Sequence, residues 1–186
     1  VEGERIEYKE YYYVMLNKPA DVITATHDRF YKTVIDILDD KYRKLGLFPV
    51  GRLDKDTEGL LILTTDGKLA HKLLSPKNLV PKTYFAIIDG VVDSSDIELF
   101  EKGISLSEDF TTLPAQLEMI TANKVYITIV EGKFHQIKRM FEYIGKKVVY
   151  LKRVKMGHLK LDENLLPGQS RELTKHEIKL LKSSTK

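Results

Sequence analysis

Short apolar runs alternate along the chain with charged, turn-rich segments, and their lengths and spacing separate strands from helices. Apolar or β-rich runs of about four to eight residues are typical of strands, and they occupy residues 11–16, 60–65, 83–88, 115–120, 125–130 and 148–154. Helices are predicted over residues 33–38, 68–74, 94–102 and 134–144. Thr174 and Glu177 form a capping-box pattern, which predicts a last helix after residue 174.

The order of these elements indicates the fold class. Strands and helices follow one another without strict alternation, which favours an α+β fold with a mostly antiparallel sheet. A chain of 186 residues suits one domain or two closely packed lobes. We expect one domain over residues 11–181, with a linker or edge strand at residues 1–10 and a tail at residues 182–186.

Composition excludes several kinds of site. The chain has no cysteine, so disulfides, thiolate metal sites and a cysteine nucleophile are excluded. No apolar run approaches the roughly 20 residues that a membrane-spanning helix needs, and we expect a cytoplasmic protein with no membrane partner. The net charge is only +3, but residues 121–160 hold ten Lys or Arg against Glu131 and Glu142. This segment predicts a patch for a polyanion, although a solvated basic face explains the charge equally well.

A charged, turn-rich segment at residues 51–59 leads directly into the buried strand predicted at residues 60–65. Asp54 lies just upstream of that strand, with Arg52 and Lys55 beside it as cations that would stabilise its negative charge. The segment therefore presents one carboxylate on a rigid edge.

The acidic residues of this segment also suit three different roles. Asp54, Asp56 and Glu58 resemble the start of a calcium loop, but the twelfth position is Thr65 instead of a bidentate glutamate, which argues against calcium. Asp54 and Asp56 share a face of an extended segment and so also suit a glycosidase pair. The residues alone favour Asp54 as a structural turn acid paired with Arg52.

A second segment of interest surrounds Tyr84. This residue begins a predicted strand, and Lys82 lies two residues earlier on the same face. Tyr84 is either an ordinary core tyrosine or a ring that stacks on a base and relays a proton through its hydroxyl.

The third segment is the predicted helix at residues 134–144. At 100° per residue its apolar side chains share one arc, and the opposite arc carries His135, Lys138, Arg139 and Glu142. His135 and Gln136 fall in the first turn, where free amides attract phosphate. The alternative is a solvated amphipathic helix.

The sequence indicates no cofactor or metal. The remaining histidines have no metal-ligand spacing, and neither a Walker loop nor a Gly-x-Gly-x-x-Gly or Gly-x-Ser-x-Gly motif is present.

Taken in order, these segments resemble the motifs of the pseudouridine synthases. The resemblance runs from about residue 11 to residue 181, and it rests on Asn17-Lys18-Pro19, Gly51-Arg52-Leu53-Asp54, Lys82-x-Tyr84, the segment from Glu131 to Met140, Leu151-Lys152-Arg153 and Gly157-x-Leu159. It implies that residues 11–181 form a pseudouridine synthase catalytic domain. The implied fold has a mixed, mostly antiparallel, bifurcated sheet flanked by helices, with two lobes around a central cleft.

The resemblance also implies roles for particular residues. Asp54 matches the nucleophile of a cofactor-free isomerisation of uridine to pseudouridine within RNA. Lys138 matches the basic partner of that carboxylate, with Arg139 as the alternative, since relatives outside this branch have arginine there. Tyr84 matches the residue that packs on the target base.

Because the third motif contains His135-Gln136, the chain resembles the RsuA-type branch that modifies small-subunit (16S) ribosomal RNA. Members of that branch carry an RNA-binding module ahead of the catalytic domain. We expect a monomer that binds ribosomal RNA in a small-subunit assembly intermediate, with RNA contacts at Arg52, Lys55, Lys82, His135, Gln136, Arg139, Lys152 and Arg153. The rival hypotheses are a large-subunit synthase, a non-catalytic RNA-binding module and a hydrolase of small glycosides.

Overall fold

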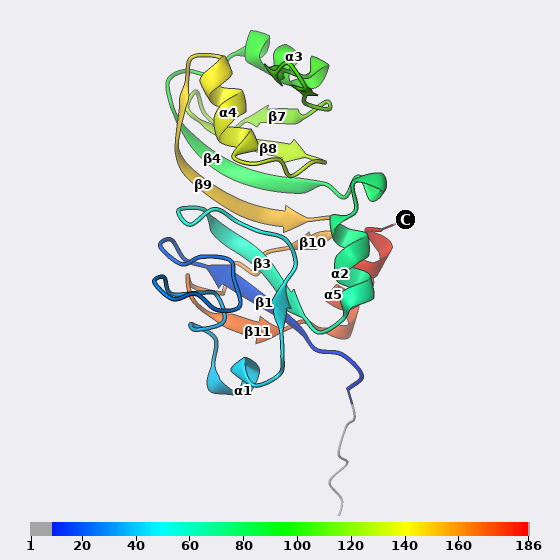
Figure 1. The fold of residues 1–186 in the computed structure, drawn as a ribbon. Coiled ribbons are helices and arrows are strands. Elements are labelled where there is room, and N and C mark those ends of the chain that lie inside the picture. The colour runs from blue at the N-terminus through cyan, green and yellow to red at the C-terminus, as the bar shows by residue number, and fades with distance from the viewer. Residues whose placement is uncertain (1–8, 186) are drawn as a thin grey trace, which may run out of the picture.

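The strands of the protein form two antiparallel halves that meet in the middle of one sheet (Figure 1). The computed structural model describes residues 9–185, and within this range one nine-stranded sheet carries all but one hairpin. The first half contains β1 (Tyr13–Lys18), β2 (Phe48–Pro49), β3 (Glu58–Thr64) and β11 (Ser170–Glu172). The second half contains β4 (Lys82–Asp89), β7 (Gln116–Met119), β8 (Lys124–Ile129), β9 (Lys147–Met156) and β10 (Leu159–Lys160).

The junction between the halves is the pairing of β3 with β9. The strand order is β11-β1-β3-β9-β4-β8-β7, and only β3 and β9 pair in parallel, through residues 58–59 and 152–153. Gly59 has a φ of +110°, and a Cβ added there would lie 2.2 Å from the carbonyl oxygen of Arg153. A glycine is therefore required where the two backbones approach. This arrangement confirms the α+β fold with a bifurcated, mostly antiparallel sheet.

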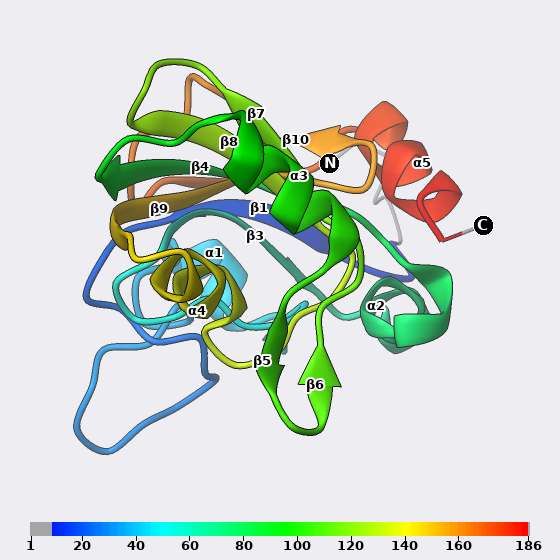
Figure 2. The same ribbon diagram turned by 90° about the horizontal axis from the view of Figure 1, so that it is seen from above.

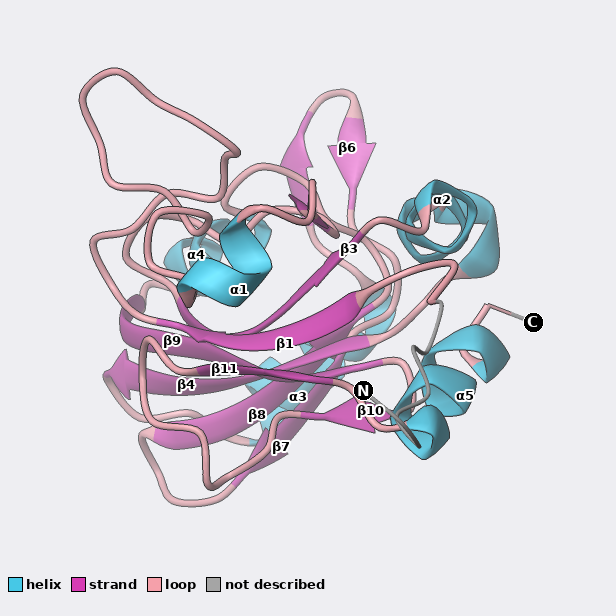
Figure 3. Ribbon diagram, turned by 90° about the horizontal axis from the view of Figure 1, so that it is seen from below, coloured by secondary structure: helices cyan, strands magenta, loops and turns pink. Residues whose placement is uncertain are grey.

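Helices cover the sheet unevenly (Figures 1 and 3). α1 (Asp40–Arg43), α3 (Ser94–Lys102) and α4 (Gln136–Tyr143) pack on one face, while α2 (Gly67–Leu74) and α5 (Lys175–Ser183) cover the other face of the first half. Alternate residues of β3 therefore enter two different cores, which explains why its apolar run is continuous. A short hairpin, β5 (Ser105–Ser107) with β6 (Phe110–Thr111), stands apart from the main sheet.

Two predicted helices differ from those observed. Residues 34–37 form a turn instead of a helix, in which the Thr33 hydroxyl accepts from the Asp36 amide and the Asp36 carboxylate accepts from the Thr33 amide. The local capping pattern is real, but the chain leaves the turn before a helix can propagate. α4 begins at Gln136 instead of residue 134, because His135 adopts a left-handed φ of 49°.

The predicted chain ends also differ. Residues 1–8 of the predicted linker or edge strand lie outside the described residues, and residues 9 and 10 are not in a strand. The predicted tail from residue 182 is wrong at its start, because α5 continues to Ser183. Ser184 is buried, and its hydroxyl accepts from the His158 amide.

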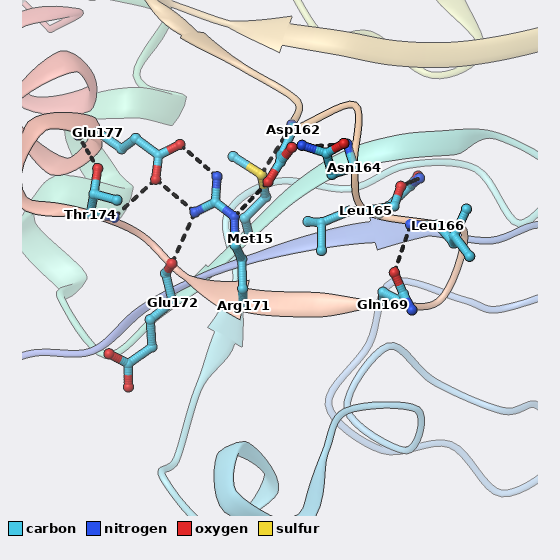
Figure 4. Close-up of polar contacts among 11 residues, drawn as sticks. Met15, Asp162, Asn164, Leu165, Leu166, Gln169, Arg171, Glu172, Thr174 and Glu177 are labelled. Atoms are coloured by element: carbon cyan, nitrogen blue, oxygen red, sulfur yellow. Dashed lines mark hydrogen bonds and ion pairs between the residues drawn. The ribbon is translucent and has the colours of Figure 1, made fainter.

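An ion-pair network holds α5 against the sheet (Figure 4). Arg171 on β11 donates to Asp162 at 2.9 Å and to both carboxylate oxygens of Glu177 at 2.7 and 2.9 Å. Glu177 also completes the predicted capping box with Thr174. The hydrogen bonds from Arg171 lower the pKa of Glu177, and a backbone amide together with Arg171 lowers the pKa of Asp162.

Candidate active site

Asp54 lies in a tight turn directly before β3, and a buried lysine fixes that turn. The Thr57 amide donates to the Asp54 carbonyl at 3.0 Å. Lys18 at the end of β1 is fully buried, and its ammonium donates to the carbonyls of Pro19, Lys55 and Thr57 at 2.9, 3.1 and 2.8 Å. Burial lowers the pKa of Lys18 to about 8, although the charges of nearby carboxylates, Asp56 first, act in the opposite direction. Lys18 therefore positions the turn that carries Asp54.

The Asp54 carboxylate contacts two side chains from α4 and its N-cap. Lys138 lies 3.1 Å from one oxygen, and the His135 imidazole lies 3.5 Å from the other. The Lys138 ammonium also donates to Asp56 at 2.7 Å. Burial alone would lower the pKa of Lys138, but the hydrogen bonds and charges of Asp56 and Asp54 outweigh it and raise that pKa. The two carboxylates therefore hold a charged ammonium between them.

The cations that sequence places beside Asp54 have different neighbours. The expectation that Arg52 and Lys55 would stabilise its charge is not met, since neither forms an ion pair with it among the residues that the structure describes. Arg52 is exposed at the wall of the cleft. Lys55 points away, with its ammonium 4.3 Å from the centre of the Tyr31 ring.

Asp54 lines a cleft to which both halves of the sheet contribute residues. The first half supplies the turn with Asp54, and the second half supplies Tyr84 of β4 and Leu151 of β9. Tyr84 is only 8% exposed and belongs to the core, yet it also lines this cleft. Its position is therefore compatible with both roles that the sequence leaves open for this tyrosine.

Two of the predicted RNA contacts, Gln136 and Arg153, are largely buried. Gln136 is 3% exposed and donates to the Glu131 carboxylate at 2.9 Å, so it supports the loop before α4. Arg153 is 2% exposed, and its Nε donates to the Leu60 carbonyl at 2.9 Å across the β3–β9 junction. Burial of these side chains follows from tertiary packing, which local sequence does not reveal.

The other predicted contacts lie in different places. Lys152 is directed to the opposite face of the sheet from Leu151, into a groove lined by Thr83 and Tyr126. Lys82 is partly buried, and that burial, followed by the charge of Arg153, lowers its pKa. Arg139 is on α4, and its guanidinium donates weakly to the Phe134 carbonyl at 3.5 Å.

Sequence reasoning missed two residues of the site. In sequence, Asp56 is considered only in a calcium loop or a glycosidase pair, and Lys18 only as part of a motif. A lysine at the end of an apolar strand was the available signal for Lys18. No local signal pointed to the contact of Asp56 with Lys138, because the two residues are distant in the sequence. Over residues 9–185, no cluster of three or more histidine or acidic side chains could hold a metal ion.

Within that same range, no helix is long and apolar enough to span a membrane.

Comparison with known proteins agrees with this geometry. The model of the family described as RNA pseudouridylate synthase matches residues 12–143. An RNA pseudouridine synthase of Bacillus subtilis, YtzG, described as uncharacterized, is 47% identical over 97% of this chain and 77% of that protein. The ribosomal small subunit pseudouridine synthase A of Vibrio cholerae is 43% identical over 89% of this chain and 72% of that protein. A crystal structure of a pseudouridylate synthase superposes with a TM-score of 0.87 and 41% identity, covering 94% of this chain and 75% of the other.

The matched family model and these relatives identify the chain as an isomerase of RNA uridine. The chain belongs to the RNA pseudouridine synthases, in their RsuA-type family.

Proposed function

We propose that this protein converts a uridine of small-subunit ribosomal RNA to pseudouridine, with Asp54 as the nucleophile. The observation that carries the assignment of roles is the contact of 3.1 Å between Lys138 and Asp54 at the floor of the cleft. A pure RNA-binding surface gains nothing from a carboxylate in a polyanion site, because the carboxylate repels phosphate.

The reaction is an isomerisation, so its atoms balance without a further reactant. The bond between the ribose C1′ and the uracil N1 breaks, the uracil turns, and a bond forms between C1′ and C5. The C5 proton is lost, and N1 ends with a proton. Asp54 would form a covalent intermediate that allows the base to turn, a role that carboxylates can fill.

Lys138 would keep the Asp54 carboxylate aimed at the substrate. The side chain of Asp54 is about one-third exposed (32%), so an extrahelical nucleotide can reach it, while Lys138 is 22% exposed and held from two sides. Tyr84 lines the same cleft and would pack against the flipped uracil, and its hydroxyl would assist removal of the C5 proton.

The RNA would approach over the exposed cations at the cleft. The residues we propose for phosphate contacts are Arg52 and His135, which line the cleft, together with Lys55 beside Tyr31 and Arg139 on α4. Their positive charge predicts that affinity falls as salt rises. Because the target base must leave its stack, unpaired segments are the favoured substrates.

The choice of small-subunit RNA rests on two observations. Relatives named for the small ribosomal subunit are 43% and 42% identical over 89% of the chain. The residue that distinguishes this branch in sequence, His135, also touches Asp54. A ribosomal substrate places the protein in the cytoplasm, with a small-subunit assembly intermediate as its partner.

The test is tritium release from ribosomal RNA labelled at uracil C5. Small-subunit RNA with a few bound proteins is compared with large-subunit RNA, using the parent protein, Asp54→Asn, and Asp89→Asn as a control at an exposed acid at the end of β4. We expect release from small-subunit RNA by the parent and by Asp89→Asn, and none by Asp54→Asn.

Other outcomes assign the rival functions. Release from large-subunit RNA alone would reject the small-subunit target. Salt-sensitive binding without any release would favour a non-catalytic RNA-binding module, and release of free uracil would indicate a hydrolase.

A further inference from the structure

Residues 24–33, called here the aromatic loop, project from the same side of the sheet as the β5–β6 hairpin (Figures 2 and 3). The base of the loop is closed, since Ile23 pairs with Thr33 and the Ile23 amide donates to the Lys32 carbonyl at 3.0 Å. Its tip is also fixed. One carboxylate oxygen of Asp28 accepts from the amides of Phe30 and Tyr31 at 2.7 and 2.8 Å. Hydrogen bonds at both its base and its tip therefore give the projecting loop a defined backbone conformation.

The aromatic loop is rooted on the turn that carries Asp54. The Thr24 hydroxyl donates to the Leu53 carbonyl at 3.0 Å and accepts from the Leu53 amide at 3.2 Å. The Asp21 amide, just before the loop, donates to the Lys55 carbonyl at 2.9 Å. Both chain neighbours of Asp54 are thus bonded to the loop or to its base, which fixes the position of the loop relative to the cleft.

Two aromatic rings at the tip are exposed to solvent. Phe30 is 83% exposed and Tyr31 is 52% exposed. Each ring has a cation over one face, with the Arg29 guanidinium 5.6 Å from the Phe30 ring centre and the Lys55 ammonium 4.3 Å from that of Tyr31. His27 and Lys32 add further basic side chains to the loop.

This combination favours a single-stranded nucleic acid over other ligands. Aromatic faces stack on any unpaired base, and neighbouring cations neutralise the attached phosphates. A protein partner that bound these rings in an apolar groove would have to remove water from the neighbouring cations, which disfavours such a partner. The loop backbone is already ordered by its hydrogen bonds, so little conformational entropy is lost on binding.

We propose that the aromatic loop binds an unpaired nucleotide next to the target uridine, with Phe30 stacking on its base and Arg29 contacting its phosphate. The inference rests on the proposed function, because it takes the RNA that occupies the cleft as the ligand. The ring of Tyr31, which lies under the Lys55 ammonium, connects the loop to the turn of Asp54.

The test compares four single variants with the parent protein. Phe30→Leu removes the ring and keeps an apolar side chain, while Phe30→Trp keeps a stacking ring. Arg29→Gln removes the cation. Tyr143→Leu is the matched control, since Tyr143 is another exposed aromatic (58%) at the far end of α4. Binding is measured by fluorescence anisotropy with a single-stranded RNA oligonucleotide and with a duplex of the same length, and isomerisation by tritium release from small-subunit RNA.

Because Phe30→Leu removes stacking on one base, we expect its affinity for single-stranded RNA to fall about 5- to 100-fold. Its kcat/KM should fall by a similar factor, through a higher KM. Duplex binding should be unchanged, and Phe30→Trp should restore both values to within about twofold of the parent. Arg29→Gln should weaken binding to both RNAs and reduce the salt dependence by about one ion.

Equal single-strand affinity of Phe30→Leu and Tyr143→Leu would overturn the inference, as would equal losses on single strand and duplex. If the parent releases no tritium, the proposed function fails, whereas the comparison of single strand with duplex still decides the role of the loop.

Discussion

The ammonium of Lys138 lies 3.1 Å from the carboxylate of Asp54, although the two residues belong to opposite halves of the sheet. Asp54 precedes β3 in the first half, and Lys138 is on α4, which packs on the second half. The same ammonium reaches Asp56 at 2.7 Å. The two acids of one turn therefore share a single lysine across the cleft.

Replacing Lys138 with methionine should lower kcat about 10²- to 10³-fold, because the preorganised charge that holds Asp54 is lost. Lys138→Arg should retain part of the activity, since it keeps the charge but changes the geometry. Single-turnover tritium release with saturating RNA measures this effect. A Lys138→Met protein with unaltered kcat would mean that the contact is structural only.

Asp56→Asn tests the second acceptor through pH dependence. Asp56 helps to raise the pKa of Lys138, so the ammonium of the parent stays charged up to at least about pH 10. Removing the Asp56 charge lowers that pKa, and the alkaline loss of kcat/KM should begin at a lower pH than in the parent. Near pH 7 both proteins keep Lys138 protonated, and their rates should agree to within about threefold. If the alkaline decrease of kcat/KM begins at the same pH in both proteins, the effect of Asp56 on the pKa of Lys138 is contradicted.

Gln136→Leu should destabilise the fold by about 1–3 kcal/mol, because the buried Glu131 contact and the hydrogen bond from the Lys133 amide are lost together. Urea unfolding measures the change, with the exposed Gln116→Leu on β7 as the control. RNA affinity of the folded protein should change little. If Gln136→Leu lowered RNA affinity without lowering stability, that result would instead support the direct RNA contact that the sequence predicts for Gln136.

Arg171→Met should reduce stability at neutral pH, and the reduction should shrink in acid. The folded-state pKa of Glu177 is lowered from its ordinary 4.5, so its stabilising contribution is complete above about pH 4.5 and is lost as pH falls through the lower folded value. Asp162 behaves in the same sense from its ordinary 3.8. Thermal unfolding of the parent and the variant should therefore converge as pH falls below these ordinary values. The exposed Arg43 pairs only with Asp40 among the described residues, and Arg43→Met should show a small difference at every pH.

The sequence by itself determined the fold class and most of the elements, and it singled out residues that the structure brings together at one cleft. Local patterns carry this information: the apolar run of β3, the capping boxes of α3 and α5, and the ordered motifs around Asp54, Tyr84 and Lys138 are each readable within a few residues. The turn at residues 34–37 was mistaken for a helix because a capping pattern shows where a helix can begin and not whether it continues.

Only the tertiary structure decided which polar side chains face the cleft. Lys138 and His135 approach Asp54 from α4 and its N-cap on the second half, whereas Arg52 and Lys55, its near neighbours in sequence, form no ion pair with it among the described residues. Gln136 and Arg153 are polar or basic in sequence yet buried, since the β3–β9 junction and the loop before α4 enclose them. Strand alternation directs Lys152 away from Asp54. Long-range packing sets these directions, and spacing along the chain carries no record of them.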